Sequence, residues 1–274
     1  MIGGKGIHGV HSGFIALFFS KYVRSPSYGI FSLFYPSAII IGFGLLIQNP
    51  PSVLFGGKRF LDYYSPEIII LSLSVYGLLL FPIDLLQSGL EKKSGGMTRN
   101  ALNGFCYVAL HLFISLCGIL ALFLCGAMLF KIQLPTRMGL FLIALAALQM
   151  VFFSFGVFFN QLSRKTSNIL VWSFSFFIVN IIFGFGTLAF SKIGIFQLIL
   201  QPFALDLAEW LPMTFAIRIA RCFYNNKTVL CEGDVLKAFL YALVLFTSAG
   251  LIAWARQKRR AKLSRAEPRD GRVT

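Results

Sequence analysis

The sequence predicts an all-α integral membrane protein, and three observations support this fold class. Hydrophobic residues make up 57% of the 274 residues and charged residues only 13%, and the mean hydropathy is +0.77. Six apolar stretches each approach the roughly 20 residues that cross the hydrocarbon core as a helix. The basic residues flank these stretches. An ordinary soluble domain is excluded, because it has no interior large enough for so much Phe, Leu and Ile.

The net charge of +15 has a distribution that favours lipid as its partner over nucleic acid. Basic residues are densest in the C-terminal tail 256–274, and most of the others border apolar stretches. Anionic headgroups and membrane topology account for that placement. We therefore expect membrane lipids, and no nucleic acid, as the partners of these side chains.

The first 27 residues predict a helix that lies along the membrane interface on the cytoplasmic side. Between Ile7 and Tyr22, apolar residues recur at helical spacing, with His8, Ser12 and Lys21 on other faces. Such amphipathic helices rest in the headgroup region. The apolar run is short and lacks a clear small-residue cleavage site, so we expect it to be retained.

Residues 28–255 predict a six-span transmembrane domain. The expected spans are 28–48, 66–86, 105–130, 138–160, 168–190 and 236–255. Asn49-Pro50-Pro51 and Phe55-Gly56-Gly57 separate the first two spans, since Pro and Gly interrupt helices. The last span stops at Arg256, where the basic cytoplasmic tail 256–274 begins.

The distribution of Lys and Arg predicts that both termini are cytoplasmic. With six crossings, about twice as many basic residues lie on that side as on the other. Lys and Arg near the ends of spanning helices accumulate in the cytoplasm. We expect a multi-pass protein of the cell membrane, inner or plasma, with Lys131 and Arg137 as mild exceptions to the rule.

The region between the fifth and sixth spans, 191–235, predicts a re-entrant pair of half-helices. Its apolar segments, Ile193 to Leu205 and Trp210 to Ala220, are each too short to cross, and Asp206 and Glu209 separate them. Broken helices are tolerated at membrane depth where protein or a water-filled cavity covers the backbone. A surface loop packed on the spans is the alternative interpretation.

Few residues in the spans are suited to chemistry. Asp84 lies close enough to the interface to be solvated, and His111 is expected to hydrogen-bond to a neighbouring helix. The spans therefore hold too few ionisable residues to predict a proton relay. No cluster predicts a metal site, no catalytic residues are expected, and no Gly-rich lysine loop predicts ATP binding in this chain. Cys222 and Cys231 either form a disulfide, if their loop is extracytoplasmic, or remain reduced.

The long loop from Gln87 to Gly104 predicts a docking surface for a soluble partner. It combines the charged Glu91-Lys92-Lys93 with the flexible Ser94-Gly95-Gly96. A simple connection between spans is the alternative on spacing alone. A rival function from another class is an intramembrane lipid-modifying enzyme, whose site would gather outward-facing tyrosines and acids around a headgroup: Tyr63, Tyr64, Glu67, Asp206 and Glu209.

Several short motifs in order resemble the membrane subunit of ABC transporters of the type-2 export class (ABC-2 type). The motifs are Arg24-Ser25-Pro26 with Phe34-Tyr35-Pro36, Tyr63-Tyr64-Ser65-Pro66, Gly89-Leu90-Glu91-Lys92-Lys93-Ser94-Gly95, and Leu211-Pro212-Met213-Thr214-Phe215-Ala216 with Arg221. They are similar, in turn, to the family's entry into its first span, the opening of its second span, its cytoplasmic Glu-Arg-Glu-x-Gly-Thr signature and its Leu-Pro-Leu-Thr-Tyr-Ala element. The likeness covers about residues 15 to 256. The Pro after the cytoplasmic signature is absent, and Phe183-Gly184-Phe185-Gly186 replaces an outward Phe-Pro element.

The resemblance implies a permease that is not itself an enzyme and holds no cofactor, with ATP and Mg in a separate ATP-binding subunit. It implies coupling to that ATPase at Glu91, Lys92, Lys93 and Gly95, and a gate region at Leu211, Pro212, Thr214, Phe215 and Arg221. It further implies a homodimer or heterodimer of permeases. The expected cargo is a lipophilic or amphipathic drug, antibiotic or lipid, with polysaccharide export as the alternative within the family.

Overall fold

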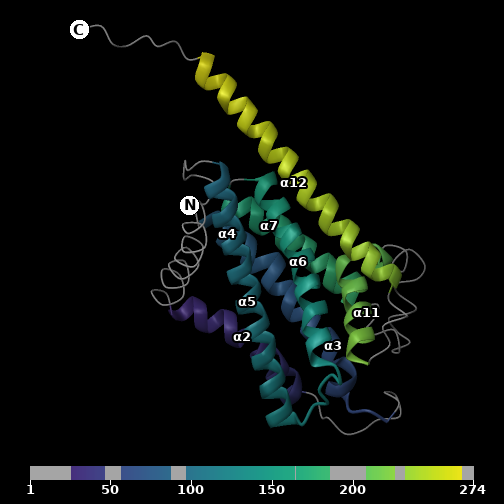
Figure 1. The fold of residues 1–274 in the computed structure, drawn as a ribbon. Coiled ribbons are helices and arrows are strands. Elements are labelled where there is room, and N and C mark those ends of the chain that lie inside the picture. Colours follow the sequence, from purple (N-terminus) through teal and green to yellow (C-terminus); the bar gives the residue numbers. More distant parts are fainter. Residues whose placement is uncertain are drawn as a thin grey trace, which may run out of the picture.

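The computed structural model describes residues 26–46, 57–87, 97–163, 165–185, 208–225 and 232–266, and all of the regular elements in these ranges are helices. Figure 1 shows them as a bundle of roughly aligned helices. In chain order the elements are α2 (Pro26–Leu46), α3 (Phe60–Ser74), the π-helix η3 (Val75–Leu80), α4 (Phe81–Gln87), α5 (Met97–Phe130), α6 (Met138–Leu162), α7 (Thr166–Val179), the π-helix η4 (Asn180–Phe185), α11 (Pro212–Tyr224) and α12 (Glu232–Ala266).

Five helices are long and apolar enough to cross a membrane, which supports the expected multi-pass membrane protein. They are Phe60–Leu86, Gly104–Phe130, Met138–Leu162, Thr166–Gly184 and Glu232–Arg256. The apolar part of α2, Leu33–Leu46, is shorter than these. The expected interfacial helix falls almost wholly on residues 1–25, outside the described ranges.

The second expected span begins earlier than the sequence predicted. The expected span opens at Pro66, but α3 already starts at Phe60 and carries Pro66 inside it. The start is fixed from outside the helix, because Arg59 pairs with Asp62 at 2.7 Å and the Arg59 carbonyl accepts a hydrogen bond from the Tyr63 amide at 3.0 Å. Pro66 is the seventh residue of α3, so its missing N–H removes the intrahelical hydrogen bond to the Asp62 carbonyl oxygen, and the contacts of Arg59 stabilise the helix start before it.

The same span contains a π-helical segment, η3, at its middle. Gly77 of η3 lies directly against α6: a Cβ atom at Gly77 would be 2.4 Å from the Cβ of Phe152. Gly156 of α6 makes the reciprocal approach, since a Cβ there would lie 3.0 Å from the Gly77 carbonyl oxygen. The two glycines allow the backbones of η3 and α6 to come close together.

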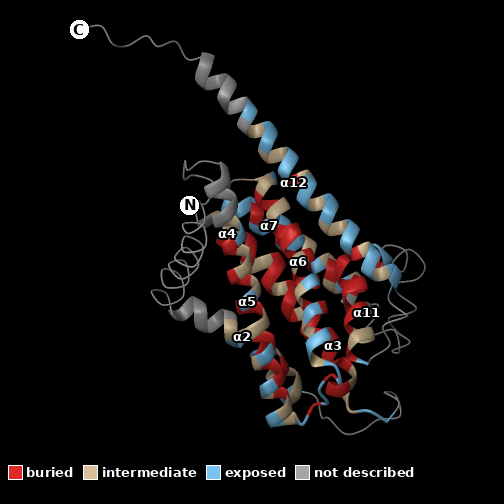
Figure 2. Cartoon of the chain, viewed as in Figure 1, coloured by how far each residue is buried: buried red, intermediate tan, exposed pale blue. Residues whose placement is uncertain are grey.

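The buried core lies where α3, η3, α6 and α11 meet, and α12 crosses its outside (Figure 2). Much of the apolar surface of α5, α7 and α12 is exposed, for example Leu124, Trp172 and Leu251. Apolar side chains on the outside of a bundle are expected where lipid is the solvent. This distribution agrees with the membrane class that composition predicted.

Helix α12 continues past the expected boundary at Arg256 as far as Ala266, so the first part of the basic tail extends the last helix. Arg256 donates from Nη2 to the carbonyl oxygen of Leu162, the last residue of α6, at 3.2 Å. Asn160 of α6 donates to the Pro82 carbonyl oxygen at 3.2 Å. We call this end of the bundle, with Asp84, Leu162 and Arg256, the Asp84 end. The opposite end, which carries the α5–α6 connection, is the Gln133 end.

Candidate functional site

Helix α11 is a short helix that is buried among longer ones. It packs against α3, α6, α12 and η4, and most of its residues are buried. Its polar face carries Arg218 and Arg221. Thr214 and Phe215 are almost fully buried. This is the segment on which the sequence analysis placed the gate residues.

The beginning of α11 is attached to the start of the second π-helix. Pro212 occupies the first turn, where its missing N–H is no loss. The next amide, Met213 N–H, donates to Oδ1 of Asn180 at 3.2 Å, and Asn180 Nδ2 donates in turn to the Phe176 carbonyl oxygen at 2.8 Å. Asn180 thus replaces a side-chain cap, which Leu211 cannot supply.

The other end of α11 reaches the Gln133 end of the bundle. The Tyr224 hydroxyl donates to the Gln133 carbonyl oxygen, and the Tyr224 ring packs edge-on against Phe141 with centroids 5.6 Å apart. Burial raises the pKa of Tyr224 to about 12, partly offset by a hydrogen bond with Ser65 and reinforced by the charge of Asp62. The hydroxyl therefore stays protonated and remains a donor at neutral pH.

These two attachments place α11 along half of the bundle. Its 13 residues span about 20 Å, starting from the Gln133 end. Near its inner end, the Trp210 carbonyl oxygen accepts a hydrogen bond from Tyr241. Tyr241 lies about 13 Å along α12 from its start at Glu232, by the helical rise. The start of α11 therefore lies beside α12 at the level of Tyr241, and its end lies at the Gln133 end of the bundle.

An ion pair joins α3 to α11. Arg221 donates from Nε to Oε1 of Glu67 at 2.5 Å, and its Nη2 also contacts this oxygen. Glu67 is completely buried in α3, whereas the Arg221 side chain is 28% exposed and lies over the Tyr63 ring at 5.7 Å. A buried carboxylate is costly unless it is paired. Arg221 therefore holds α11 against α3 and neutralises Glu67.

A second buried polar cluster lies toward the Asp84 end. We call Asp84, His111, Tyr76 and Tyr107 the Asp84–His111 network. His111 Nε2 lies 2.8 Å from Asp84 Oδ2, Tyr107 donates to the same oxygen at 2.5 Å, and the Tyr76 hydroxyl lies 2.8 Å from His111 Nδ1. Aromatic rings enclose the imidazole, with Phe81 edge-on at 5.3 Å.

The structure corrects the expectation that Asp84 is solvated. Asp84 is only 7% exposed and His111 is fully buried, so the two groups form one network across η3, α4 and α5. The expectation that His111 is hydrogen-bonded within the bundle is confirmed. The network joins a carboxylate, an imidazole and two phenols, a set that can hold and redistribute protons but contains no activated nucleophile. No group of His, Cys, Asp and Glu side chains suited to a metal ion occurs in the described part of the chain.

The remaining expected site residues are divided between described and undescribed parts. Leu211, Pro212, Thr214, Phe215 and Arg221 all lie on or at the start of α11, as expected. The coupling residues Glu91, Lys92, Lys93 and Gly95 lie outside the described ranges. Cys222 is half-buried in α11, but Cys231 lies outside them, so a disulfide between the two stays a prediction.

Sequence reasoning missed two pairings: the ion pair between Glu67 and Arg221, and the contact between Asp84 and His111. Glu67 was grouped with outward-facing residues, although it lies seven residues inside an apolar helix. The available signal was an acid within this apolar run together with the two Arg of the short helix, because a buried charge requires a partner of opposite sign. Glu209, a second acid of that proposed group, lies 3.7 Å from Arg218, and the third, Asp206, lies outside the described residues.

Comparisons with known proteins add no relative: no protein-family model, curated protein or solved structure matches this chain.

Proposed function

We propose that this chain is the membrane-spanning permease subunit of a type-2 ABC exporter. The observation that carries the proposal is helix α11. It packs lengthwise against the longer helices, is tied to α7 through Asn180 and to α3 through Glu67, and directly precedes α12 in chain order. The resemblance implies a re-entrant helical element at this place in the chain, and α11 has the length and attachments of the returning half of such an element.

The proposal takes α2 as the first of six spans. Its 21 residues reach the length of a crossing helix, although their strongly apolar part is shorter. With six spans both termini lie in the cytoplasm and the Asp84 end faces the cytoplasm. The Gln133 end, with Tyr224 and the start of α12, then faces outward from the cell membrane.

The proposed route of coupling runs through α4. A separate ATP-binding subunit, which holds ATP and Mg, docks on the loop that contains Glu91, Lys92, Lys93 and Gly95. Helix α4 ends at Gln87, immediately before this loop, and Asp84 ties it to α5 through His111. A movement of the loop therefore pulls on η3 and on the Asp84–His111 network, and coupling follows if inward and outward states differ in affinity for the cargo.

The proposed assembly pairs this permease with a second copy or a related permease, and the proposed cargo is lipophilic or amphipathic: a drug, an antibiotic or a lipid. Two features are compatible with both proposals. The outer surfaces of α5, α7 and α12 are strongly apolar, and the described spans hold few charges. These two features favour an apolar cargo over a polar sugar chain, because a sugar chain needs a hydrated path.

A substitution at the proposed docking loop tests this function. In the reconstituted complex, Glu91→Ala should leave the chain folded and inserted but uncouple ATP hydrolysis from export, while Asp206→Asn should transport normally. Full export by the Glu91→Ala protein would overturn the docking assignment. Loss of activity in Asp206→Asn with Glu91 dispensable would instead favour an intramembrane lipid-modifying enzyme with its site on the outer side.

A further inference from the structure

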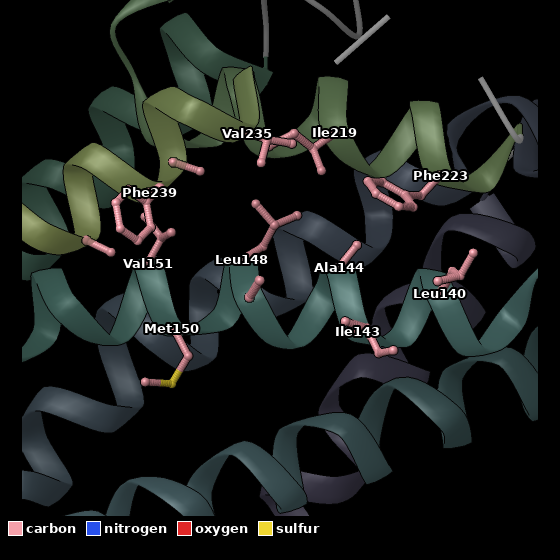
Figure 3. Close-up of a pocket in the computed structure, with 13 residues that line it drawn as sticks. Leu140, Ile143, Ala144, Leu148, Met150, Val151, Ile219, Phe223, Val235 and Phe239 are labelled. Atoms are coloured by element: carbon pink, nitrogen blue, oxygen red, sulfur yellow. The ribbon is translucent and has the colours of Figure 1, made fainter. Parts of the chain in front are cut away.

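An apolar groove lies between α6, α11 and α12, away from both polar clusters. Its volume is about 570 Å³, within the roughly 300–1,000 Å³ of typical small-molecule sites. Figure 3 shows side chains of α6 facing those of α11 and α12 across it, with Leu148 opposite Ile219. Every lining residue is apolar.

Small residues on two helices create this space. Ala144 and Ala147 of α6 face the groove, as do Ala238 and Ala242 of α12. With alanine on both sides, the side chains do not fill the gap between the helices. The rim is open to the outside, because Ile143 and Phe239 are 67% and 64% exposed. The groove is therefore accessible from the side of the bundle.

The dimensions of the groove match one leaflet of a bilayer. It extends along α6 from Leu140, near the Gln133 end, to Val151. That distance is about 16 Å at the helical rise, about half of a hydrocarbon core roughly 30 Å thick. Half of the core is the length of one acyl chain. A cavity with no polar lining stays dry, and hydrocarbon is its natural occupant.

Charged residues border the groove near α11 and the start of α12. Arg218 and Asp234 each directly precede a lining residue, Ile219 and Val235 respectively. Arg218 lies 3.7 Å from Glu209 and 3.8 Å from Asp234, distances longer than hydrogen bonds. The guanidinium keeps donors for a phosphate, and the 59% exposed Glu209 side chain is available to an ammonium group.

From this combination we propose that the groove binds a zwitterionic glycerophospholipid of the surrounding membrane. One acyl chain fills the space between α6 and α12, the phosphate contacts Arg218, and the ammonium contacts Glu209. An anionic headgroup without an ammonium fits less well, because two carboxylates lie beside Arg218. The site does not depend on the transport function proposed above.

The test uses the full-length chain in phosphatidylcholine vesicles that contain a trace of phosphatidylethanolamine with a photoreactive group in its acyl chain. Peptide mapping by mass spectrometry locates the crosslinks. We expect saturable labelling of α6 and α12 at the groove. Ala147→Trp fills the space, so groove labelling should fall about tenfold, equivalent to ~1.4 kcal/mol. The matched control, Val171→Trp on the exposed face of α7, should label like the wild type.

A separate variant, Arg218→Gln, tests the contact with the lipid headgroup. A diacylglycerol probe with the same photoreactive chain lacks phosphate and ammonium, so the wild type should label more strongly with phosphatidylethanolamine, and Arg218→Gln should remove this preference. Gel filtration and thermal unfolding establish that each variant is folded.

Three results would overturn the proposal. They are labelling spread evenly over the exposed faces of α5, α7 and α12, labelling unchanged by Ala147→Trp, and a wild type that labels equally with both probes. Efficient disulfide formation between two copies of a Phe239→Cys variant, with no lipid labelling at the groove, would assign the surface to a second copy of the chain instead.

Discussion

Arg221 of α11 donates through Nε to Oε1 of Glu67 in α3 at 2.5 Å, although the two residues are 154 positions apart in the chain. Glu67 is fully buried, and its other carboxylate oxygen has no hydrogen-bond partner among the described residues. One oxygen of Glu67 therefore carries the whole contact. This pair fixes the position of α11 against α3.

Removing either partner should have unequal effects on stability. Arg221→Gln leaves an unpaired carboxylate in the bundle and should lower the free energy of unfolding by about 3–5 kcal/mol. Glu67→Gln should cost less, because the amide is neutral and still accepts a hydrogen bond. The double variant should be more stable than Arg221→Gln alone. Thermal unfolding in detergent measures the double-mutant cycle, and additive losses would show that the pair contributes no coupling.

The Asp84–His111 network should depend more on Tyr107 than on Tyr76. Tyr107 donates to the Asp84 carboxylate at 2.5 Å, and hydrogen bonds to charged groups contribute about 1.5–3 kcal/mol. Tyr76 instead bonds His111 Nδ1 at 2.8 Å. Hydrogen bonds between uncharged groups contribute about 0.5–1.5 kcal/mol. Tyr107→Phe should therefore destabilise the chain more than Tyr76→Phe. Unfolding midpoints that are equal, or in the reverse order, would contradict a charged Asp84.

Gly77→Ala tests the close approach of η3 to α6. The new Cβ would lie 2.4 Å from the Cβ of Phe152, so the backbones must separate at a cost of about 1–3 kcal/mol. Gly250→Ala in α12 is the matched control, because no atom lies within 4 Å of the added Cβ. It should be neutral or stabilise the helix by up to about 1 kcal/mol. Equal unfolding temperatures for the two variants would argue against the close packing.

The contact between α11 and the α5–α6 connection should be lost at alkaline pH, when the Tyr224 hydroxyl ionises and no longer donates to Gln133. Its pKa is raised from 10.0 to about 12, so burial favours the protonated, neutral phenol. The stability linked to this group is complete below pH 10 and is lost as pH rises from 10 through 12. The difference in tyrosinate absorbance between wild type and Tyr224→Phe should show a midpoint near pH 12. A midpoint near 10 would mean that the hydroxyl is solvated.

The membrane class and the positions of most helices were predictable because lipid requires long apolar helices, which composition reveals directly. Helix α11 was also predictable as a segment, since Pro212 marks its first turn and Arg218 and Arg221 define a polar face. Its attachments to the rest of the bundle were not predictable. They depend on Asn180 and Gln133, which are distant in sequence and unremarkable by themselves.

The boundary at Pro66 and the solvation of Asp84 were wrong for a common reason. Both were inferred from the local sequence: the first from an apolar run and the resemblance of Tyr63-Tyr64-Ser65-Pro66 to a span opening, the second from the place of an acid near the end of a span. In the structure, side-chain contacts decide both positions. The Arg59–Asp62 pair, three residues apart, stabilises an earlier start of α3, and the distant residues His111 and Tyr107 enclose Asp84.

The central claim, an ABC permease, is tested most directly by purifying the tagged full-length chain from its native membrane in mild detergent and measuring what accompanies it. We predict a P-loop ATPase at one copy per permease chain, released or weakened by Glu91→Ala. If no ATPase accompanies a chain that is intact and monodisperse, in repeated preparations and after mild crosslinking in the membrane, the permease assignment is contradicted.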